Sequence, residues 1–174
     1  MLRYRAVEHR EGKSFTTASP RVSEMDSNGQ LARIFGPLMN WAIDDKNNTS
    51  RSLIEKWAGI DKKAALPKFA KKTLVSKAKK FTTEVNVDAP AYGRKAVLYA
   101  TCFSNYHNTS IGESAIKVLK HNGVDVEVVY PQCCGMPQLE QGDIQRVAEN
   151  AKSTASDLVK WVEKGYDVIA VVSS

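Results

Sequence analysis

Residues 96–102 read Ala-Val-Leu-Tyr-Ala-Thr-Cys, and residues 124–135 read Val-Asp-Val-Glu-Val-Val-Tyr-Pro-Gln-Cys-Cys-Gly. Each stretch begins with a short run of apolar and β-branched residues, which is typical of a buried parallel strand. Each run is followed within a few residues by cysteine. The three cysteines of the chain, Cys102, Cys133 and Cys134, therefore all come shortly after predicted strands.

Helical patterns connect these predicted strands. Ser110 and Glu113 have the spacing of a capping box, which predicts the start of one helix. Asp143 is the predicted N-cap of a second, longer helix. Residues 168–172 then form a third short apolar run. The order βαβαβ predicts an α/β fold with a three-stranded parallel layer, because a connection that contains a helix joins parallel strands.

This topology makes a prediction about the cysteines. In open parallel sheets, ligands bind outside the carboxyl ends of the strands. Cys102 follows the first strand, Cys133 and Cys134 follow the second, and the pair Ser173-Ser174 follows the third. We therefore expect all three thiols at one edge of the layer. Gly135 leaves the backbone free to turn there or to approach a ligand closely.

Several kinds of chemistry are open to such a set of thiols. A single buried cysteine is often an inert small hydrophobe, but three at one edge favour metal or redox chemistry. Zinc is disfavoured, because the chain has no Cys-x-x-Cys and only His107 lies nearby in sequence. A vicinal disulfide is chemically possible but strained. Thiolates suit iron–sulfur ligation, which needs about four protein ligands, one more than the cysteines of this chain supply.

The first half of the chain differs in composition. Residues 1–21 are polar without a sustained period and predict an irregular lead-in. Residues 22–90 predict a helical and lysine-rich linker segment. In this segment Trp41 and Trp57 lie on apolar helix faces, as core or interface anchors. Residues 91–174 then form the α/β domain, with a boundary near residue 90.

The net charge of +6 invites a nucleic-acid interpretation. The excess is local, however, since eight lysines and no acidic residue lie between Lys62 and Lys80. Such a run is usually a solvated face. The alternative is a non-enzymatic binding module that docks an acidic partner or a membrane surface through this face. Nucleic acid is disfavoured because no arginine–aromatic interleaving accompanies the lysines. A nucleotide-binding function is also disfavoured, because the loop after the first strand lacks a glycine-rich phosphate-binding sequence.

The sequence also bears on the cellular compartment. No apolar stretch approaches the roughly 20 residues that span a bilayer. The start, Met-Leu-Arg-Tyr-Arg, lacks the apolar segment of a secretory signal. An odd number of cysteines argues against a secreted disulfide framework. We expect a cytoplasmic protein, and the lysine run is compatible with peripheral association at the inner face of the membrane.

The cysteine pattern carries a family resemblance. Residues 100–103 together with residues 130–137 resemble the CCG domain of iron–sulfur oxidoreductases. This group includes the CCG-containing subunits of heterodisulfide reductase and of anaerobic glycerol-3-phosphate dehydrogenase. The resemblance is specific over residues 92–174 and looser over residues 31–90. Residues 138–143 are especially similar to the glycerol-3-phosphate dehydrogenase branch.

The resemblance implies half of a CCG-type domain, truncated at its C-terminus. In the family pattern a Cys-x-x-Cys follows the next strand, which would place it just after Ser174. The resemblance also implies a [4Fe-4S] cluster, non-cubane in some members, with Cys102, Cys133 and Cys134 as ligands and Gly135 beside them. The ligand set is expected to be incomplete in this chain, and the chain alone to be inactive.

The family moves electrons, so the resemblance also implies partners. These are a flavoprotein or a ferredoxin as the redox partner, and a quinone or a disulfide as acceptor. Asn105, His107 and Asn108 lie in the loop expected after the first strand and are candidate hydrogen-bond donors around the cluster. The alternative for these three residues is ordinary loop capping.

Overall fold

The computed structural model describes residues 1–13, 21, 23–81 and 83–171. The expectations for Val172, Ser173 and Ser174 lie outside this part of the chain. The chain forms two compact units. The first contains residues 1–71 and 133–151, and the second contains residues 72–132 and 152–174. The predicted domain limits at residues 21 and 90 stay a prediction.

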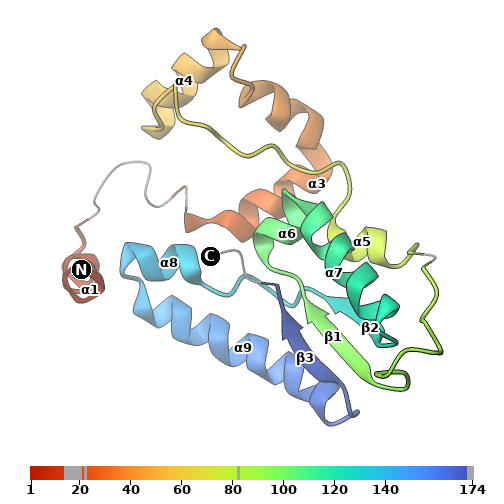
Figure 1. Ribbon diagram of the computed structural model, residues 1–174. Coiled ribbons are helices and arrows are strands. Elements are labelled where there is room, and N and C mark those ends of the chain that lie inside the picture. The colour runs from red at the N-terminus through yellow and green to blue at the C-terminus, as the bar shows by residue number, and fades with distance from the viewer. Residues whose placement is uncertain (14–20, 22, 82, 172–174) are drawn as a thin grey trace. The chain divides into compact units, whose positions relative to one another are not determined.

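The second unit contains the sheet. Its strands are β1 (Lys95–Tyr99), β2 (Asp125–Val129) and β3 (Asp167–Ala170). They form a three-stranded sheet in the order β2-β1-β3, and both pairings are parallel (Figure 1). Tyr99 at the end of β1 is in register with Val129 of β2 and with Ala170 of β3. The predicted α/β fold with a parallel three-stranded layer is confirmed.

The core of this unit lies on β1. Residues 96–100 are all buried, as expected for the central strand of a parallel sheet. Leu98 and Ala100 pack with Leu74 of α5 (Leu74–Ala78) and Ile116 of α7 (Thr109–His121). Their side chains are at most 2% exposed, so the two helices close one face of the central strand.

The start of α7 differs from the prediction. Asn108 is the N-cap residue, and the Ser110 hydroxyl donates to its side-chain oxygen at 2.6 Å. The Glu113 carboxylate instead accepts a hydrogen bond from Lys77 Nζ at 2.6 Å. The predicted capping box is therefore wrong, because α7 begins at Thr109 and Ser110 already lies inside the helix.

The second crossover helix, α9 (Ile144–Val162), agrees with the prediction. Asp143 is its N-cap, since Asp143 Oδ1 accepts a hydrogen bond from the backbone N–H of Arg146 at 3.1 Å. The residues of α9 all lie in the described part of the chain, and none of them is buried. Strand β3 is also largely exposed, with Val168 at 42%. Strand β3, at the edge of the sheet, is thus much less covered than the central strand β1.

The first unit contains α1 (Leu2–Arg10), α3 (Met25–Ala42), α4 (Asn48–Ala58) and α8 (Met136–Gln141). The irregular lead-in predicted for residues 1–21 is wrong over α1. Residues 2–10 contain no proline or glycine and are rich in arginine. Their intrinsic helix propensity therefore favours a helix, although the sequence shows no periodic apolar pattern.

Helix α3 is kinked, with non-helical dihedral angles at Phe35, two residues before Pro37. Asn47 caps α4, and Gly59 ends it in the left-handed conformation. Trp41 is 61% exposed and Trp57 is 78% exposed, so neither is a core residue of the described chain. Their predicted role as interface anchors stays a prediction. Among the described residues, no helix combines the length and the apolar character needed to cross a bilayer.

Candidate functional site

Cys102 lies at the point where β1 gives way to a short helix. Thr101 is the N-cap of α6 (Cys102–Tyr106), and its hydroxyl oxygen accepts a hydrogen bond from the backbone N–H of Ser104 at 3.3 Å. The loop predicted here is therefore wrong in its first five residues. Cys102 is the first residue of the helix and is 8% exposed. The capped helix α6 thus sets the position of Cys102 in the second unit.

The candidate donors near Cys102 have structural partners. The Asn105 side-chain oxygen accepts from the backbone N–H of Val75 at 3.2 Å, which ties α6 to α5. The His107 ring stacks on Phe103 with centroids 5.6 Å apart. Asn108 caps α7. All three residues contribute to local folding, and a further role as donors to a bound cluster stays a prediction.

A set of tyrosines orders the chain at the carboxyl ends of the strands in the second unit. The Tyr99 hydroxyl donates to the carbonyl oxygen of Gln132 at 2.7 Å. Tyr106 packs edge-on against Tyr130, with ring centroids 5.2 Å apart. These contacts fix the segment after β2 up to the residue before the cysteine pair. The sequence analysis missed them, although a tyrosine at the end of each of two adjacent strands is a readable signal.

In the first unit, Cys133, Cys134 and Gly135 form a sharp turn into α8. Cys133 is buried at 2% exposure, whereas Cys134 is exposed. Gly135 has φ +88°, and a Cβ atom at this position would lie 3.3 Å from Val147 Cα. Only glycine suits both constraints. The turn therefore buries Cys133 and leaves Cys134 exposed. A role for Gly135 beside a bound cofactor stays a prediction.

The two adjacent thiols interact. A hydrogen bond with the Cys133 thiol, followed by burial, raises the pKa of the Cys134 thiol above its ordinary value. The backbone N–H groups of Met136 and of Cys134 itself act in the opposite direction, because they donate to the Cys134 sulfur. The two N–H donors would stabilise a thiolate at Cys134.

Residues after the turn hold it in place. Gln138 of α8 is buried, and its amide nitrogen donates to the carbonyl oxygen of Ser23 at 2.7 Å. Gly142 ends α8 with φ +85°, and the backbone of Arg5 in α1 comes so close that a Cβ atom would clash with it. Arg5 also donates to the carbonyl oxygen of Glu140 at 2.6 Å. Helix α1 thus packs against the element that follows the cysteines, which the sequence analysis did not foresee.

The donor set can be compared with what an iron–sulfur cluster requires. Cysteine thiolates are the right ligands, and the N–H groups at Cys134 suit a charged sulfur. Among the described residues, however, no group of three or more His, Cys, Asp or Glu is arranged to hold a metal ion. Cys102 belongs to the second unit and the cysteine pair to the first. The cysteines are therefore the right type of ligand for a cluster, but there are too few of them. That Cys102, Cys133 and Cys134 bind the same cluster stays a prediction.

The lysine run is divided between the two units at residues 71 and 72. Lys68 Nζ pairs with the Asp44 carboxylate at 2.7 Å. Lys77 Nζ pairs with Glu113 and also donates to the Thr109 hydroxyl at 2.7 Å. The other six lysines of the run are exposed: Lys62, Lys63, Lys71, Lys72, Lys79 and Lys80. Two lysines of the run, Lys68 and Lys77, thus form ion pairs within the fold.

Comparison with known proteins identifies one family. The model of the CCG family, described as a cysteine-rich domain, matches residues 96–174. Similar proteins are lactate utilization protein A of Bacillus thuringiensis (strain Al Hakam) and of Bacillus cytotoxicus, and lactate utilization protein A 2 of Bacillus mycoides (strain KBAB4). Each is 30% identical over 59 residues, which is 33% of this chain. The matched region is only 25% of the length of these relatives. No solved structure matches the chain.

Proposed function

Because residues 96–174 belong to the CCG family of cysteine-rich domains, we propose that this chain is an electron-transfer part of an iron–sulfur oxidoreductase. The family predicted from the cysteine pattern is confirmed. We propose Cys102, Cys133 and Cys134 as ligands of a [4Fe-4S] cluster. The observation that supports this most is the turn at Gly135, where the exposed residue Cys134 has two backbone N–H donors at its sulfur.

When bound, the cluster would supply one-electron transfer. The chain itself would supply thiolate ligands and control their surroundings. The N–H groups at the Cys134 sulfur would lower the electron density on that ligand and so favour the reduced cluster. The burial of Cys102 and Cys133 would keep water away from two of the ligands. Gly135 would keep the turn in the conformation that directs Cys134 outward.

A complete cluster site would need further ligands. The three cysteines fall short of the usual number of about four ligands, so at least one ligand would come from outside the described residues. The redox partner would be a flavoprotein or a ferredoxin, and the acceptor a quinone or a disulfide. The name of the relatives suggests lactate as the source of the electrons. In a second form of this proposal, the bound cluster is of the non-cubane type that some family members contain.

Anaerobic reconstitution of the protein with iron and sulfide would test the proposal. We expect a visible thiolate-to-iron absorption band, iron and sulfide in the protein after gel filtration, and an EPR signal on reduction. Adding a small thiol as the missing ligand should raise the iron content. The EPR spectrum would also distinguish a cubane from a non-cubane cluster.

Single substitutions sharpen this test. Cys102→Ser, Cys133→Ser and Cys134→Ser should each lower the bound iron. Ser153→Ala, at an exposed position of α9, should leave it unchanged. Equal iron content in the wild type and in the three serine variants would contradict the proposed ligands. A protein that stays colourless with a small thiol present would contradict the cluster itself.

A further inference from the structure

Helices α3 and α4 of the first unit expose an unusual amount of apolar side chain. Leu38 and Trp41 of α3 are each 61% exposed, and Leu53 and Trp57 of α4 are 62% and 78% exposed. Within each helix these residues are three or four positions apart, so they lie along one face. Single exposed apolar residues are ordinary on protein surfaces, but rows of them on two consecutive helices mark a contact surface. We call these rows the α3–α4 face.

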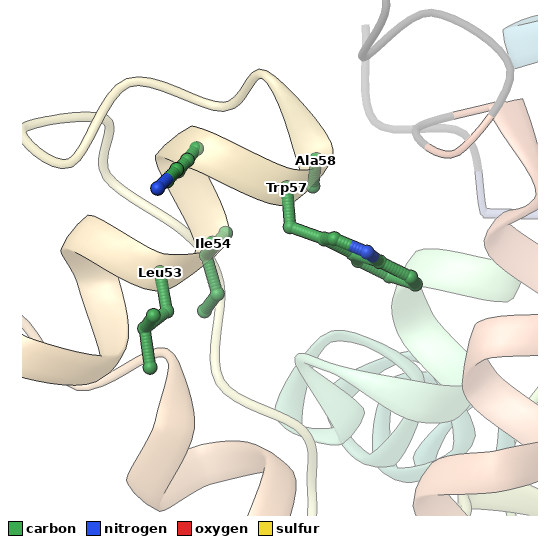
Figure 2. Close-up of a pocket in the computed structure, with 5 residues that line it drawn as sticks. Leu53, Ile54, Trp57 and Ala58 are labelled. Carbon is green, nitrogen blue, oxygen red and sulfur yellow. The ribbon is translucent and has the colours of Figure 1, made fainter.

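The α3–α4 face is hollowed. A hollow of about 580 Å³ on α4 is lined by Leu53, Ile54, Lys56, Trp57 and Ala58. Figure 2 shows Leu53 and Ile54 extending from α4 on the same side, with Trp57 projecting from the helix further along. A second hollow of about 680 Å³ lies on the part of α3 that precedes the kink at Phe35. It is lined by Ser27, Gln30, Leu31, Arg33 and Ile34. Hollows of this kind accept projecting apolar side chains.

The charged residue in each described lining is cationic. Lys56 is the charged residue of the first lining and Arg33 that of the second, and neither set of described lining residues includes a carboxylate. The Arg21 guanidinium also lies over the Trp57 ring, 4.9 Å from its centroid. A ligand with negative charges beside its apolar side chains would therefore match the rim.

The basic segment that follows α4 is fixed to the same helices. The buried Arg51 of α4 donates through Nε and Nη2 to the carbonyl oxygen of Lys62, at 3.1 and 3.0 Å. Asn40 of α3 exchanges two hydrogen bonds with the backbone of Phe69, at 2.9 and 2.7 Å. The lysines between these anchor points are thus held at α3 and α4, which adds positive charge to this part of the unit.

We propose that the α3–α4 face binds an amphipathic helix of a partner protein, with acidic residues flanking its apolar side. The spacing of three and four residues along both helices suits a helical ligand, and the cationic rim suits its carboxylates. Two hollows favour inserted side chains over the headgroups and tails of a bilayer. The proposal needs no cluster, so it can be tested with all three cysteines replaced by serine and can fail independently of the proposed function.

The test uses a designed peptide of about 18 residues, long enough for five helical turns, with Leu and Phe on one face and Glu on its flanks. A matched peptide carries Lys in place of Glu. We expect the Glu peptide to change the tryptophan fluorescence and to bind more weakly as salt rises. Trp57→Ala should weaken binding about tenfold or more. Lys56→Glu should weaken it about three- to tenfold at low salt and less at high salt.

Matched controls separate this face from the rest of the surface. Val118→Ala removes a 60% exposed apolar side chain from α7, and Lys152→Glu reverses an exposed charge on α9. Both should leave binding of the Glu peptide unchanged, and circular dichroism should show that every variant is folded. Leu53→Asn is a second variant on the face and should act in the same direction as Trp57→Ala.

Four results would overturn the proposal. The Lys peptide could bind as well as the Glu peptide, or the Trp57 and Leu53 variants could bind the Glu peptide like the wild type. Tight binding to phosphatidylglycerol vesicles that Trp57→Ala abolishes, without binding of the Glu peptide, would assign the face to a membrane. Self-association in sedimentation experiments that Trp57→Ala abolishes, again without peptide binding, would assign it to a second copy of the chain.

Discussion

Strand β1 in the second unit and the α3–α4 face in the first are both rich in apolar residues, and they differ in what covers those residues. Residues 96–100 are all buried, and Leu98 is fully inaccessible. On the α3–α4 face, Leu38 is 61% exposed and Trp57 is 78% exposed. The apolar residues of β1 are enclosed by neighbouring strands and helices of their own unit, whereas those of the α3–α4 face contact little else in theirs.

The difference separates two uses of apolar side chains. Burial of the β1 residues stabilises the fold, because the apolar surface has already been removed from water. The same kind of surface on α3 and α4 is still hydrated, so its burial would contribute to binding. Paired substitutions, one in each region, can test this division directly.

The largest difference is expected for leucine truncation. Leu98→Ala removes a fully buried side chain between α5, α7 and the sheet, and should lower the free energy of unfolding by about 2 to 5 kcal/mol. Leu38→Ala removes a side chain that is 61% exposed, and should change the free energy of unfolding by less than about 0.5 kcal/mol. Urea unfolding under reducing conditions measures both. Equal losses would show that the α3–α4 face is packed in solution.

Glycines in the two regions give a second matched pair. Gly112 of α7 faces Leu74, whose Cδ1 and Cγ would lie 2.9 and 3.0 Å from an added Cβ atom. Because Leu74 is itself fully buried, Gly112→Ala should destabilise the protein by about 1 to 3 kcal/mol through overpacking. Gly36 of α3 has no atom within 4 Å of an added Cβ atom. Gly36→Ala should therefore leave stability unchanged or raise it by up to about 1 kcal/mol.

Thermal melting of the two alanine variants would decide between these outcomes. Both glycines are buried at the backbone, so burial alone predicts the same result for both. A loss of stability in Gly36→Ala comparable to that in Gly112→Ala would mean that a neighbour not yet identified covers the kink of α3.

Buried and half-buried asparagines form the third pair. Asn105→Ala leaves the backbone N–H of Val75 without its acceptor inside the second unit, and should cost about 1 to 3 kcal/mol. Asn40→Ala removes two hydrogen bonds to Phe69, but water can replace them at a half-buried position. Its cost should be about 0.5 to 1.5 kcal/mol.

Limited trypsin digestion adds a local measurement to this pair. Asn40→Ala should speed cleavage after the lysines of residues 62–71, because the tether of this segment to α3 is lost. Asn105→Ala should leave that rate unchanged as long as the protein is folded. Faster cleavage of this segment in Asn105→Ala alone would contradict the assignment of Asn40 as its tether.

The sheet could be predicted from the sequence because its signals are local. The apolar run around Val97 and the β-branched run around Val128 are too short for helices, and the caps between them are readable. Asp143 caps α9 in the structure as predicted. The Gly135 turn was also predictable, since glycine is the residue that tolerates its positive φ.

The errors arose where a distant residue decides a local conformation. Glu113, which was predicted to form a local capping box, contacts Lys77, 36 positions away in the chain. Helix α1 has no apolar stripe, and its contact with Gly142 joins residues far apart in the chain. Helix α6 was missed for another reason, because the Thr101 cap was overlooked beside the cysteine that follows it.

The candidate site was predictable in its ligand type but not in its surroundings. The three cysteines and the CCG pattern pointed to iron–sulfur chemistry. The N–H donors at Cys134 and the Tyr99 contact to Gln132 depend on three-dimensional backbone geometry that no motif encodes. That Cys102 shares a ligand set with the pair remains a prediction, because these residues lie in different units.

The smallest difference is expected for two ion pairs that titrate in acid. A hydrogen bond from Lys68 lowers the pKa of Asp44, next to α3, from 3.8 to about 2. A hydrogen bond from Lys77 lowers the pKa of Glu113, on α7, below its ordinary value of 4.5. Each carboxylate binds its proton more weakly in the folded state. The stability that it contributes is therefore present above the ordinary pKa and is lost as the pH falls through the lowered one.

Carboxyl carbon NMR titration would locate both transitions, and Asp44→Asn and Glu113→Gln would show their effect on unfolding. We expect Asp44→Asn to lessen the fall in stability between about pH 4 and pH 2, with little change at pH 7, because the pair is exposed. Glu113→Gln should also act at neutral pH, since Lys77 would keep the Thr109 contact but lose its counter-charge against the packed face of α7. If Asp44→Asn destabilised the protein more than Glu113→Gln at pH 7, the segment beside the α3–α4 face would be held by charge more firmly than the sheet unit, and the contrast between the two regions would fail.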